Sequence, residues 1–175
     1  MDEFLRDIER RALRMAEFRT GNRDDALEIV QEAMFGLVKR YSSRPANEWK
    51  PLFYRILQSR INDWHRRQKV RNRVISVVHW VKGGEAESPV DIVEQAPASY
   101  HSNPDDAIQL SLKTEVMIKA IGELPKRQQQ AFMLRAWEGL SVAETATAMS
   151  CSQGSVKTHY SRAVHTLRDK IEDEQ

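Results

Sequence analysis

Polar and basic side chains recur along one side of the last predicted helix, which begins near residue 153. Hydroxyl groups and permanent cations near a helix start suit phosphate contacts and hydrogen bonds to base edges. The other side is an apolar stripe with three- and four-residue steps, which predicts packing against other helices. The alternative is the solvated face of an ordinary three-helix unit. The polar side holds Lys157, Thr158, Ser161, Arg162 and His165, and the stripe holds Val156, Tyr160, Ala163, Leu167 and Ile171.

The preceding segments predict how this helix is presented. The pattern indicates a helix over residues 125–138, a short helix over 142–149, and a turn at 150–152. Two helices joined by so short a turn form a helix-turn-helix, which presents its second helix to a DNA major groove. Local signals support each boundary. They are Pro125 at a first helical turn, Gly139 after a helix end, and the capping-box pair Ser141 and Glu144.

A second basic cluster lies on the third helix of the amino-terminal half. Its cations suit a nucleic-acid backbone, and its interleaved aromatic and amide groups suit exposed bases. Asp63 is the one acid among them, and the alternative is a solvated basic face. We expect Trp49 in the core, whereas Trp64 fits either the core or a base contact. The cations are Arg55, Arg60, Arg66, Arg67, Lys69, Arg71 and Arg73.

The sequence offers no catalytic or metal-binding constellation. Cys151 is the only cysteine, so it can form no intramolecular disulfide, and we expect a small buried side chain in the turn. The five histidines show no ligand spacing. A nuclease using Asp24, Asp25 and Glu28 as metal ligands is an alternative interpretation, but acids in a helix's first turn are explained by the helix dipole. We therefore expect no cofactor, no metal and no enzymatic activity.

Charge and composition divide the chain into two predicted helical domains. Residues 1–82 carry 18 basic and 11 acidic side chains, whereas residues 83–112 carry six acids and no Lys or Arg. This acidic stretch has Gly-Gly, three prolines and several serines, as is typical of a flexible linker. We predict an all-α protein with domains at 1–73 and 111–175 and a linker at 74–110. The acids are expected to screen the basic third helix in the free protein.

The amino-terminal domain is predicted to contain three helices. The first ends near residues 20–22, where Asn22 can cap the second. The second is expected to bury an apolar stripe that ends with Leu37, Val38 and Tyr41. No apolar run reaches the roughly 20 residues of a membrane span, and the amino terminus lacks a signal-peptide core. We therefore expect a cytoplasmic protein with no membrane insertion.

Three ordered motifs together resemble a known family. They are DALEIVQEAMFGLVKRY at 25–41, WKPLFYRILQSRINDWHRR at 49–67, and the helix-turn-helix segment from LPKRQQQAF to HTLR at 124–168. This order resembles a bacterial RNA polymerase sigma factor of the extracytoplasmic-function group, which keeps only the second and fourth sigma regions. The amino terminus is shorter than in many relatives, so part of the usual first helix is expected to be missing.

The resemblance implies roles for particular residues. The first motif matches the helix that docks on the clamp coiled coil of core polymerase. The second matches the region that melts and reads the minus-ten element, and the recognition helix reads the minus-thirty-five element. The clamp positions are Asp25, Leu27, Gln31, Glu32 and Phe35. The minus-ten positions are Arg55, Ser59, Arg60, Asn62, Asp63, Trp64, Arg66 and Arg67. The minus-thirty-five positions are Ser155, Lys157, Thr158, Ser161 and Arg162.

The resemblance also implies partners and one departure from the pattern. Core polymerase, through its clamp and flap, promoter DNA and an anti-sigma factor are the implied partners. Relatives often have Asn where this chain has Ser59, and one hydroxyl cannot offer the paired hydrogen bonds of an amide. The base preference at the minus-ten element is therefore expected to differ from that of relatives with Asn at this position. The rival interpretation is a free-standing helix-turn-helix regulator with a helical sensor domain.

Overall fold

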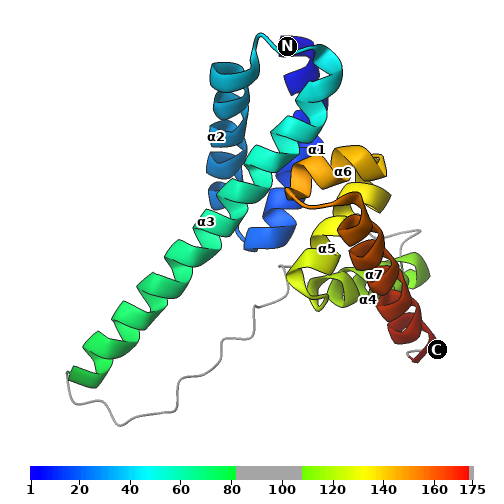
Figure 1. The fold of residues 1–175 in the computed structure, drawn as a ribbon. Helices are drawn as coiled ribbons and strands as arrows, with labels where there is room; N and C mark the ends of the chain where they lie inside the picture. Colours follow the sequence, from blue (N-terminus) through cyan, green and yellow to red (C-terminus); the bar gives the residue numbers. More distant parts are fainter. Residues whose placement is uncertain (82–107, 174–175) are drawn as a thin grey trace.

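The protein is all-α over the residues that the structure, a computed structural model, describes: 1–81 and 108–173. The helices labelled in Figure 1 are α1 (Asp2–Thr20), α2 (Arg23–Tyr41), α3 (Ala46–Val81), α4 (Ile108–Gly122), α5 (Lys126–Phe132), α6 (Val142–Met149) and α7 (Gln153–Asp173). A π-helical turn, η1 (Met133–Trp137), continues α5. The all-α prediction is confirmed. Most of the predicted linker, with its six acids, lies outside the described residues, so its screening role stays a prediction. Helix α3 continues to Val81, past the predicted domain end at residue 73.

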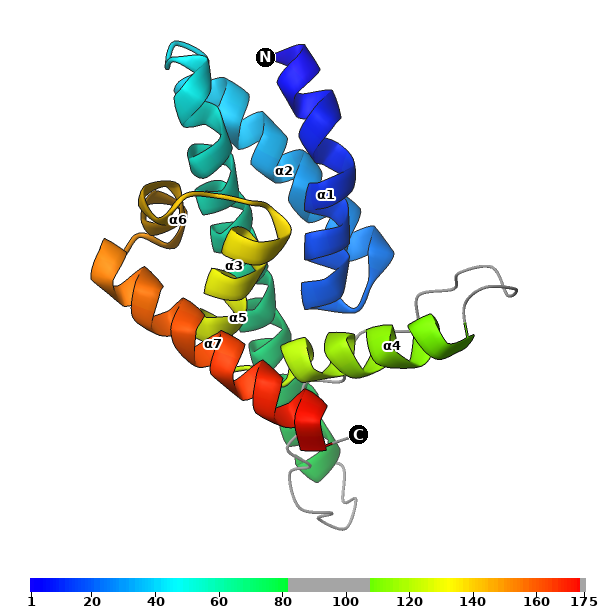
Figure 2. The ribbon, with the colours of Figure 1, turned by 90° about the vertical axis from the view of Figure 1, so that its right-hand side faces the viewer.

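Helices α1, α2 and α3 pack together around one core (Figure 2). Gly36 allows α2 to approach α3 closely, because a Cβ there would lie 3.3 Å from Cγ2 of Ile56. Val38 departs from the prediction, since its side chain is 42% exposed. The fully buried large side chains of this core are Met15, Leu37, Phe53, Tyr54, Leu57 and Ile61.

The turn between α1 and α2 forms as its residues predict. Gly21 takes the left-handed conformation at φ 66°, which closes α1. The side chain of Asn22 accepts hydrogen bonds from the backbone N–H groups of Asp24 and Asp25 at 2.9 and 3.0 Å. These bonds satisfy donors that a helix start leaves unpaired. The predicted cap is therefore confirmed.

Helices α4 to α7 form the second helical unit, and its boundaries also follow the predicted signals. Gly139 is left-handed at φ 67°, and the capping box of Ser141 and Glu144 is present in both directions. Ser150 closes α6 at φ 51°. The predicted single helix over 125–138 is instead an α-helix followed by the π-helical turn η1. The wider turn lets the backbone N–H of Leu140 reach the carbonyl of Leu134 at 3.0 Å.

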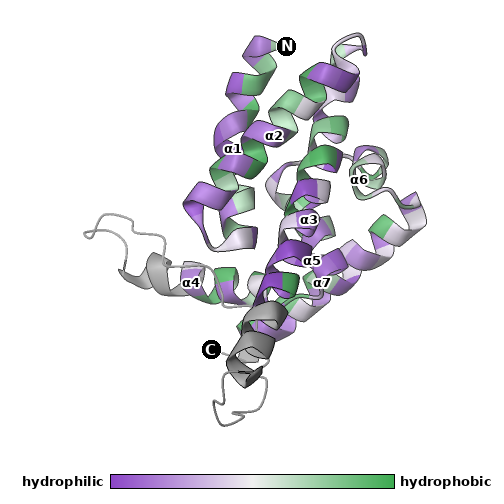
Figure 3. Ribbon diagram, turned by 90° about the vertical axis from the view of Figure 1, so that its left-hand side faces the viewer, coloured by the Kyte–Doolittle hydropathy of each residue, from purple (hydrophilic) through white to green (hydrophobic). Residues whose placement is uncertain are grey.

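The two helical units are in contact rather than separate. Helix α6 lies against α3, the long helix of the first unit (Figure 2). Figure 3 shows α3 as alternating hydrophobic and hydrophilic bands, as expected of a helix with one packed side and one polar side. Within α3, Ile56 and Leu57 are buried while Arg55 and Ser59 are exposed. The same helix therefore contributes to the core and carries a polar outer surface.

Candidate nucleic-acid interface

Helix α7 presents the predicted polar face to solvent. Its apolar residues Val156, Ala163 and Leu167 are buried against the rest of the second unit. The side chains of Lys157 and Arg162 form no hydrogen bond or ion pair with any described residue. Two cations without internal partners remain available for phosphates or base edges. Lys157, Thr158, Ser161 and Arg162 are exposed and Ser155 is half-buried.

The start of α7 is fixed by its own hydroxyl groups. The Oγ of Ser152 accepts a hydrogen bond from the backbone N–H of Ser155 at 3.1 Å, which caps the helix. The two serine hydroxyls are 2.9 Å apart and share a hydrogen bond. Thr158 donates its hydroxyl to the carbonyl of Gly154 at 3.1 Å. The oxygen of Thr158 still accepts, so this residue suits a base donor better than a base acceptor.

Aromatic and guanidinium contacts hold α7 on the preceding helices. The rings of Phe132 and Tyr160 stack with centroids 6.2 Å apart and planes at 18°. The guanidinium of Arg135 lies 5.6 Å from the centre of the Tyr160 ring. Arg127 donates to the carbonyl of Met149 at 3.0 Å, which ties α5 to the end of α6. These contacts give the recognition helix a fixed orientation.

The basic outer face of α3 is only partly free. Arg60 pairs with Glu32 of α2 at 3.5 Å, and Arg66 donates to Asp63 at 3.1 Å. The sequence pattern predicted no acidic partner from another helix for the basic residues of α3. The ion pair between Arg60 and Glu32 was therefore not predicted. The exposed predicted minus-ten positions are Arg55, Ser59, Asn62, Arg66 and Arg67, while Arg60, Asp63 and Trp64 are half-buried.

Trp64 is used partly in packing. It lies against the hydrophobic core, and its ring meets the His65 ring edge-on with centroids 4.9 Å apart. The indole Nε1 is buried without a hydrogen-bond partner among the described residues. A buried N–H without a partner costs free energy. The Trp64 ring therefore packs against the core in this conformation, and its unpaired N–H is a cost of that packing. Trp49 also packs against the core, as expected, and donates to the carbonyl of Arg44 at 2.9 Å.

An exposed stripe on α2 combines apolar and polar side chains. Leu27, Gln31 and Phe35 recur at four-residue steps, so they share one side of the helix. Phe35 is 69% exposed and Leu27 is 36% exposed. Glu32 is half-buried by its contact with Arg60, and Asp25 is half-buried at the helix start. Exposed large apolar side chains in one place indicate a protein partner.

Other kinds of site are scarce. The described residues contain no group of His, Cys, Asp or Glu that could hold a metal ion, and none of their helices is long and apolar enough to cross a membrane. Cys151 is half-buried and packs against the core.

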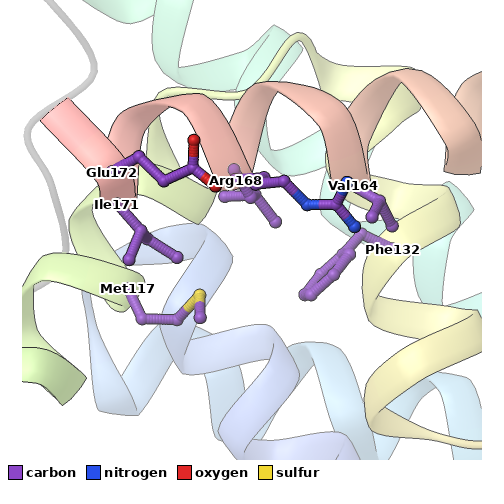
Figure 4. A pocket seen from close by; sticks show the side chains of 7 residues that line it. Met117, Phe132, Val164, Arg168, Ile171 and Glu172 are labelled. Atoms are coloured by element: carbon purple, nitrogen blue, oxygen red, sulfur yellow. The ribbon is translucent and has the colours of Figure 1, made fainter.

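An apolar cavity of about 500 Å³ opens between α4, α5 and α7 (Figure 4). It is lined by Met117, Phe132, Val164, Leu167, Arg168, Ile171 and Glu172.

The fold and these surfaces define a helical protein with a helix-turn-helix, a basic helix and an exposed apolar stripe. Comparison with protein families gives two matches. The model of sigma-70 region 2 matches residues 1–71, and the model of sigma-70 region 4 matches residues 114–167. Together they cover more than two-thirds of the chain. The first match contains α2 and most of α3, and the second contains the helix-turn-helix.

Curated relatives and a solved structure agree with these matches. The chain is 39% identical over 72 residues to the ECF RNA polymerase sigma factor BldN of Streptomyces coelicolor. These 72 residues cover 41% of this chain and 27% of BldN. It is 25% identical over 171 residues to the RNA polymerase sigma-E factor of the same organism, spanning 97% of this chain and 85% of that one. The fold matches the sigma factor RpoE, solved with the anti-sigma factor NepR from Bartonella quintana, at a TM-score of 0.63 and 20% identity over both full chains. The chain belongs to the sigma-70 family of RNA polymerase sigma factors, in the extracytoplasmic-function group.

The structure brings each predicted residue set together on one element. The clamp set lies on α2, the minus-ten set on α3 and the minus-thirty-five set on α7. Sequence reasoning missed Val38, which lies one turn beyond Phe35 and extends the exposed apolar stripe. The three-residue step from Phe35 to Val38 was the available signal. Whether each residue contacts polymerase or DNA stays a prediction.

Proposed function

We propose that this chain is a promoter-recognition subunit that binds core RNA polymerase and directs it to a specific class of promoters. The single observation that carries the proposal is the combination of three surfaces on one chain of the sigma-70 family. These are the exposed stripe of α2, the basic face of α3 and the polar face of α7. A free-standing regulator needs the third surface and has no use for the first.

The stripe of α2 is the proposed contact with the clamp coiled coil. Leu27 and Phe35 supply apolar area, and Gln31 between them supplies hydrogen bonds at its centre. Such a mixed stripe fits another helix, which offers apolar ridges and polar flanks in the same spacing. Glu32 acts differently, because its carboxylate pairs with Arg60. We assign Glu32 the added role of linking the clamp contact to the minus-ten helix.

The two DNA surfaces have different tasks. On α7, four exposed polar residues suit the major groove of duplex DNA at the minus-thirty-five element. On α3, Arg55, Arg66 and Arg67 suit the backbone of a melted strand, with Ser59 and Asn62 beside them for base contacts. The sigma factor family is not an enzyme family, and we propose that core polymerase supplies all the chemistry here.

The remaining partners follow from the second unit and from a relative. The apolar cavity beside α7 is the proposed seat of the polymerase flap. The relative RpoE was solved with an anti-sigma factor, and we propose the same kind of regulation for this chain in the cytoplasm. Binding of the purified chain to core polymerase tests the function. A chain that binds duplex promoter DNA tightly and ignores core polymerase would instead be a free-standing regulator.

A further inference from the structure

The two helices of the helix-turn-helix are joined covalently at one end. Helices α6 and α7 meet at the turn over residues 150–152 and diverge from it (Figure 2). The buried apolar side chains Val156, Ala163 and Leu167 hold α7 on the second unit. Apolar burial is non-directional, so by itself it specifies the crossing angle of the two helices and the rotation of α7 only weakly. Directional contacts away from the turn are needed to fix both.

The guanidinium of Arg135 in η1 makes two such contacts at once. Its Nη1 donates a hydrogen bond to the backbone carbonyl of Leu140, the residue before the Ser141 cap of α6. The same guanidinium lies 5.6 Å from the centre of the Tyr160 ring on α7, where a cation is attracted to the ring face. The start of α6 is its far end from the turn, and Tyr160 lies about two turns into α7. One side chain therefore connects the two helices away from the turn that joins them.

Both partners of Arg135 are themselves held in place. The backbone N–H of Leu140 donates to the carbonyl of Leu134 at 3.0 Å, so both of its backbone polar groups are bonded to η1. The Tyr160 ring stacks on Phe132 of α5, with centroids 6.2 Å apart and planes at 18°. A guanidinium between two fixed groups can move little, because a shift that keeps one contact breaks the other.

The π-helical turn brings the start of α6 within reach of Arg135. The backbone N–H of Glu138 bonds to the carbonyl of Met133 at 3.0 Å, five residues back, where an α-helix would use Leu134. The carbonyl of Leu134 instead accepts from Leu140, which turns the chain back toward η1 just before α6 begins. π-helical turns are rare and occur often at functional positions. The unusual turn and the Arg135 contacts therefore belong to one local arrangement.

We propose that Arg135 is a positioning residue for minus-thirty-five recognition, which fixes α7 relative to α6 so that the exposed side chains of α7 meet the base edges in register. The inference rests on the proposed function of the chain. Base edges are read by hydrogen bonds, which weaken steeply when their distance or angle departs from the optimum. Phosphate contacts tolerate the same displacement better, because they depend mainly on charge. Arg135 therefore controls how well bases are distinguished rather than how strongly DNA is held.

The test uses the complete chain bound to core polymerase. One DNA probe is a promoter fragment recovered by mapping the 5′ ends of transcripts made with the wild-type chain, and the other is the same fragment with only the minus-thirty-five element scrambled. Fluorescence anisotropy of the labelled DNA gives both affinities, and their ratio is the discrimination. A salt series on the scrambled fragment measures the contribution of phosphate contacts. Circular dichroism checks that each variant is folded at the temperature used.

Substitution of Arg135 should lower the discrimination. Arg135→Met removes the hydrogen bond and the charge over the ring, and it should lower the ratio about tenfold, as expected for misplacing one bidentate base contact. Its affinity for the scrambled fragment and its salt slope should stay unchanged. Arg135→Lys should lower the ratio as well, because an ammonium lacks the planar fork that makes both contacts together. Lys170→Met is the matched control, since it makes the same charge change on α7 and removes only the ion pair with Glu123.

Variants of Tyr160 test whether Arg135 acts through the ring. Tyr160→Phe keeps an aromatic face for the guanidinium and for the stack with Phe132, so it should keep the wild-type ratio. Tyr160→Leu removes that face and should lower the ratio as Arg135→Met does. The two losses should not add in the double variant, because both substitutions break the same contact.

Two results would overturn the inference and leave the proposed function standing. An unchanged ratio in Arg135→Met would show that α7 is positioned without this contact. An equal loss of affinity for both fragments, with a flatter salt slope, would make Arg135 a phosphate contact. If Arg135→Met loses helix content, Arg135→Lys and the Tyr160 pair decide the same question. A wild-type complex that binds both fragments equally would contradict the proposed function, and the inference would fall with it.

Discussion

At the scale of single residues, exposure separates positions that hold the fold from positions free to act. Phe35 is the most exposed large apolar side chain among the described residues, whereas Leu37 two residues on is fully buried. On α7, Val156 is buried and the adjacent Lys157 is exposed. A substitution at an exposed position changes stability by less than about 0.5 kcal/mol, so its effect on binding can be measured cleanly.

The α2 stripe gives the first prediction. Phe35→Ser should weaken binding to core polymerase by about 2 kcal/mol, because it removes the most exposed apolar anchor of the described residues from the contact. Helix content and thermal midpoint should stay unchanged. Arg40→Ala, an exposed position on another side of α2, is the control. Fluorescence anisotropy of the labelled chain, titrated with core polymerase, measures the affinity of both variants for core polymerase. Equal loss in the two variants would show that this stripe is not the contact.

The polar residues of the same stripe give a second prediction. Gln31→Ala should weaken binding to core polymerase while leaving DNA melting by the bound enzyme intact. Glu32→Ala should weaken both, because it also releases Arg60 from its ion pair at 3.5 Å. Binding and permanganate reactivity of melted promoter DNA give the two readouts. If the two variants behave alike in both assays, the added role of Glu32 is wrong.

The recognition helix separates base reading from backbone contact. Arg162 can pair bidentately with a guanine edge, so Arg162→Ala should cost about 1–3 kcal/mol at one base pair of the minus-thirty-five element. Lys157 is a compact charge nearer the helix start, and Lys157→Ala should weaken binding to all sequences and flatten the salt dependence by about one unit. Binding of both variants to single-base promoter mutants over a salt series is the measurement. Reversed behaviour would mean that the two roles are exchanged.

At the scale of elements, α6 depends on its cap. The Oγ of Ser141 accepts from the backbone N–H of Glu144 at 3.2 Å, and the Glu144 carboxylate accepts from that of Ser141 at 2.7 Å. Hydrogen bonds to the Glu144 carboxylate from Ser141, chiefly from its backbone N–H, lower the pKa of Glu144 below its usual 4.5. The stabilisation is therefore complete above pH 4.5 and is lost as pH falls through the lower folded-state pKa. Ser141→Ala should cost about 1 kcal/mol of stability.

The pH arm of this prediction uses Glu144→Gln, which keeps a hydrogen-bond acceptor at this position but cannot titrate. Its unfolding free energy should depend less steeply on pH below 4.5 than that of the wild type. Urea unfolding at several acidic pH values, followed by circular dichroism, gives the comparison. An identical slope in both proteins would show that the cap does not contribute this titration.

Elements with local signals were predicted from sequence, and long-range features were not. The Asn22 cap, the left-handed Gly139 and the turn before α7 each depend on a few adjacent residues, and all three form. The π-helical turn was missed because tertiary packing decides it, not local propensity. The pairing of Arg60 with Glu32 and the burial of Glu138 also join elements distant in sequence. Periodicity assigns a face to a residue but does not say what covers it.

At the scale of the whole molecule, the family match and the three surfaces point to one activity. The region 2 match contains the proposed clamp and minus-ten residues, and the region 4 match contains the proposed minus-thirty-five residues. The free chain brings the two units together through α3 and α6. We propose that promoter engagement separates them and that polymerase holds the units at the spacing of the two elements.

Reconstituted transcription tests the central claim most directly. Purified chain is added to core polymerase lacking any other sigma factor, genomic DNA fragments are transcribed, and the 5′ ends of the transcripts are sequenced. We predict a one-to-one complex with core polymerase and discrete start sites that share upstream motifs near positions −10 and −35. The Phe35→Ser chain should lose these start sites. Unchanged, random initiation in the presence of a chain that still binds duplex DNA would contradict the proposed function.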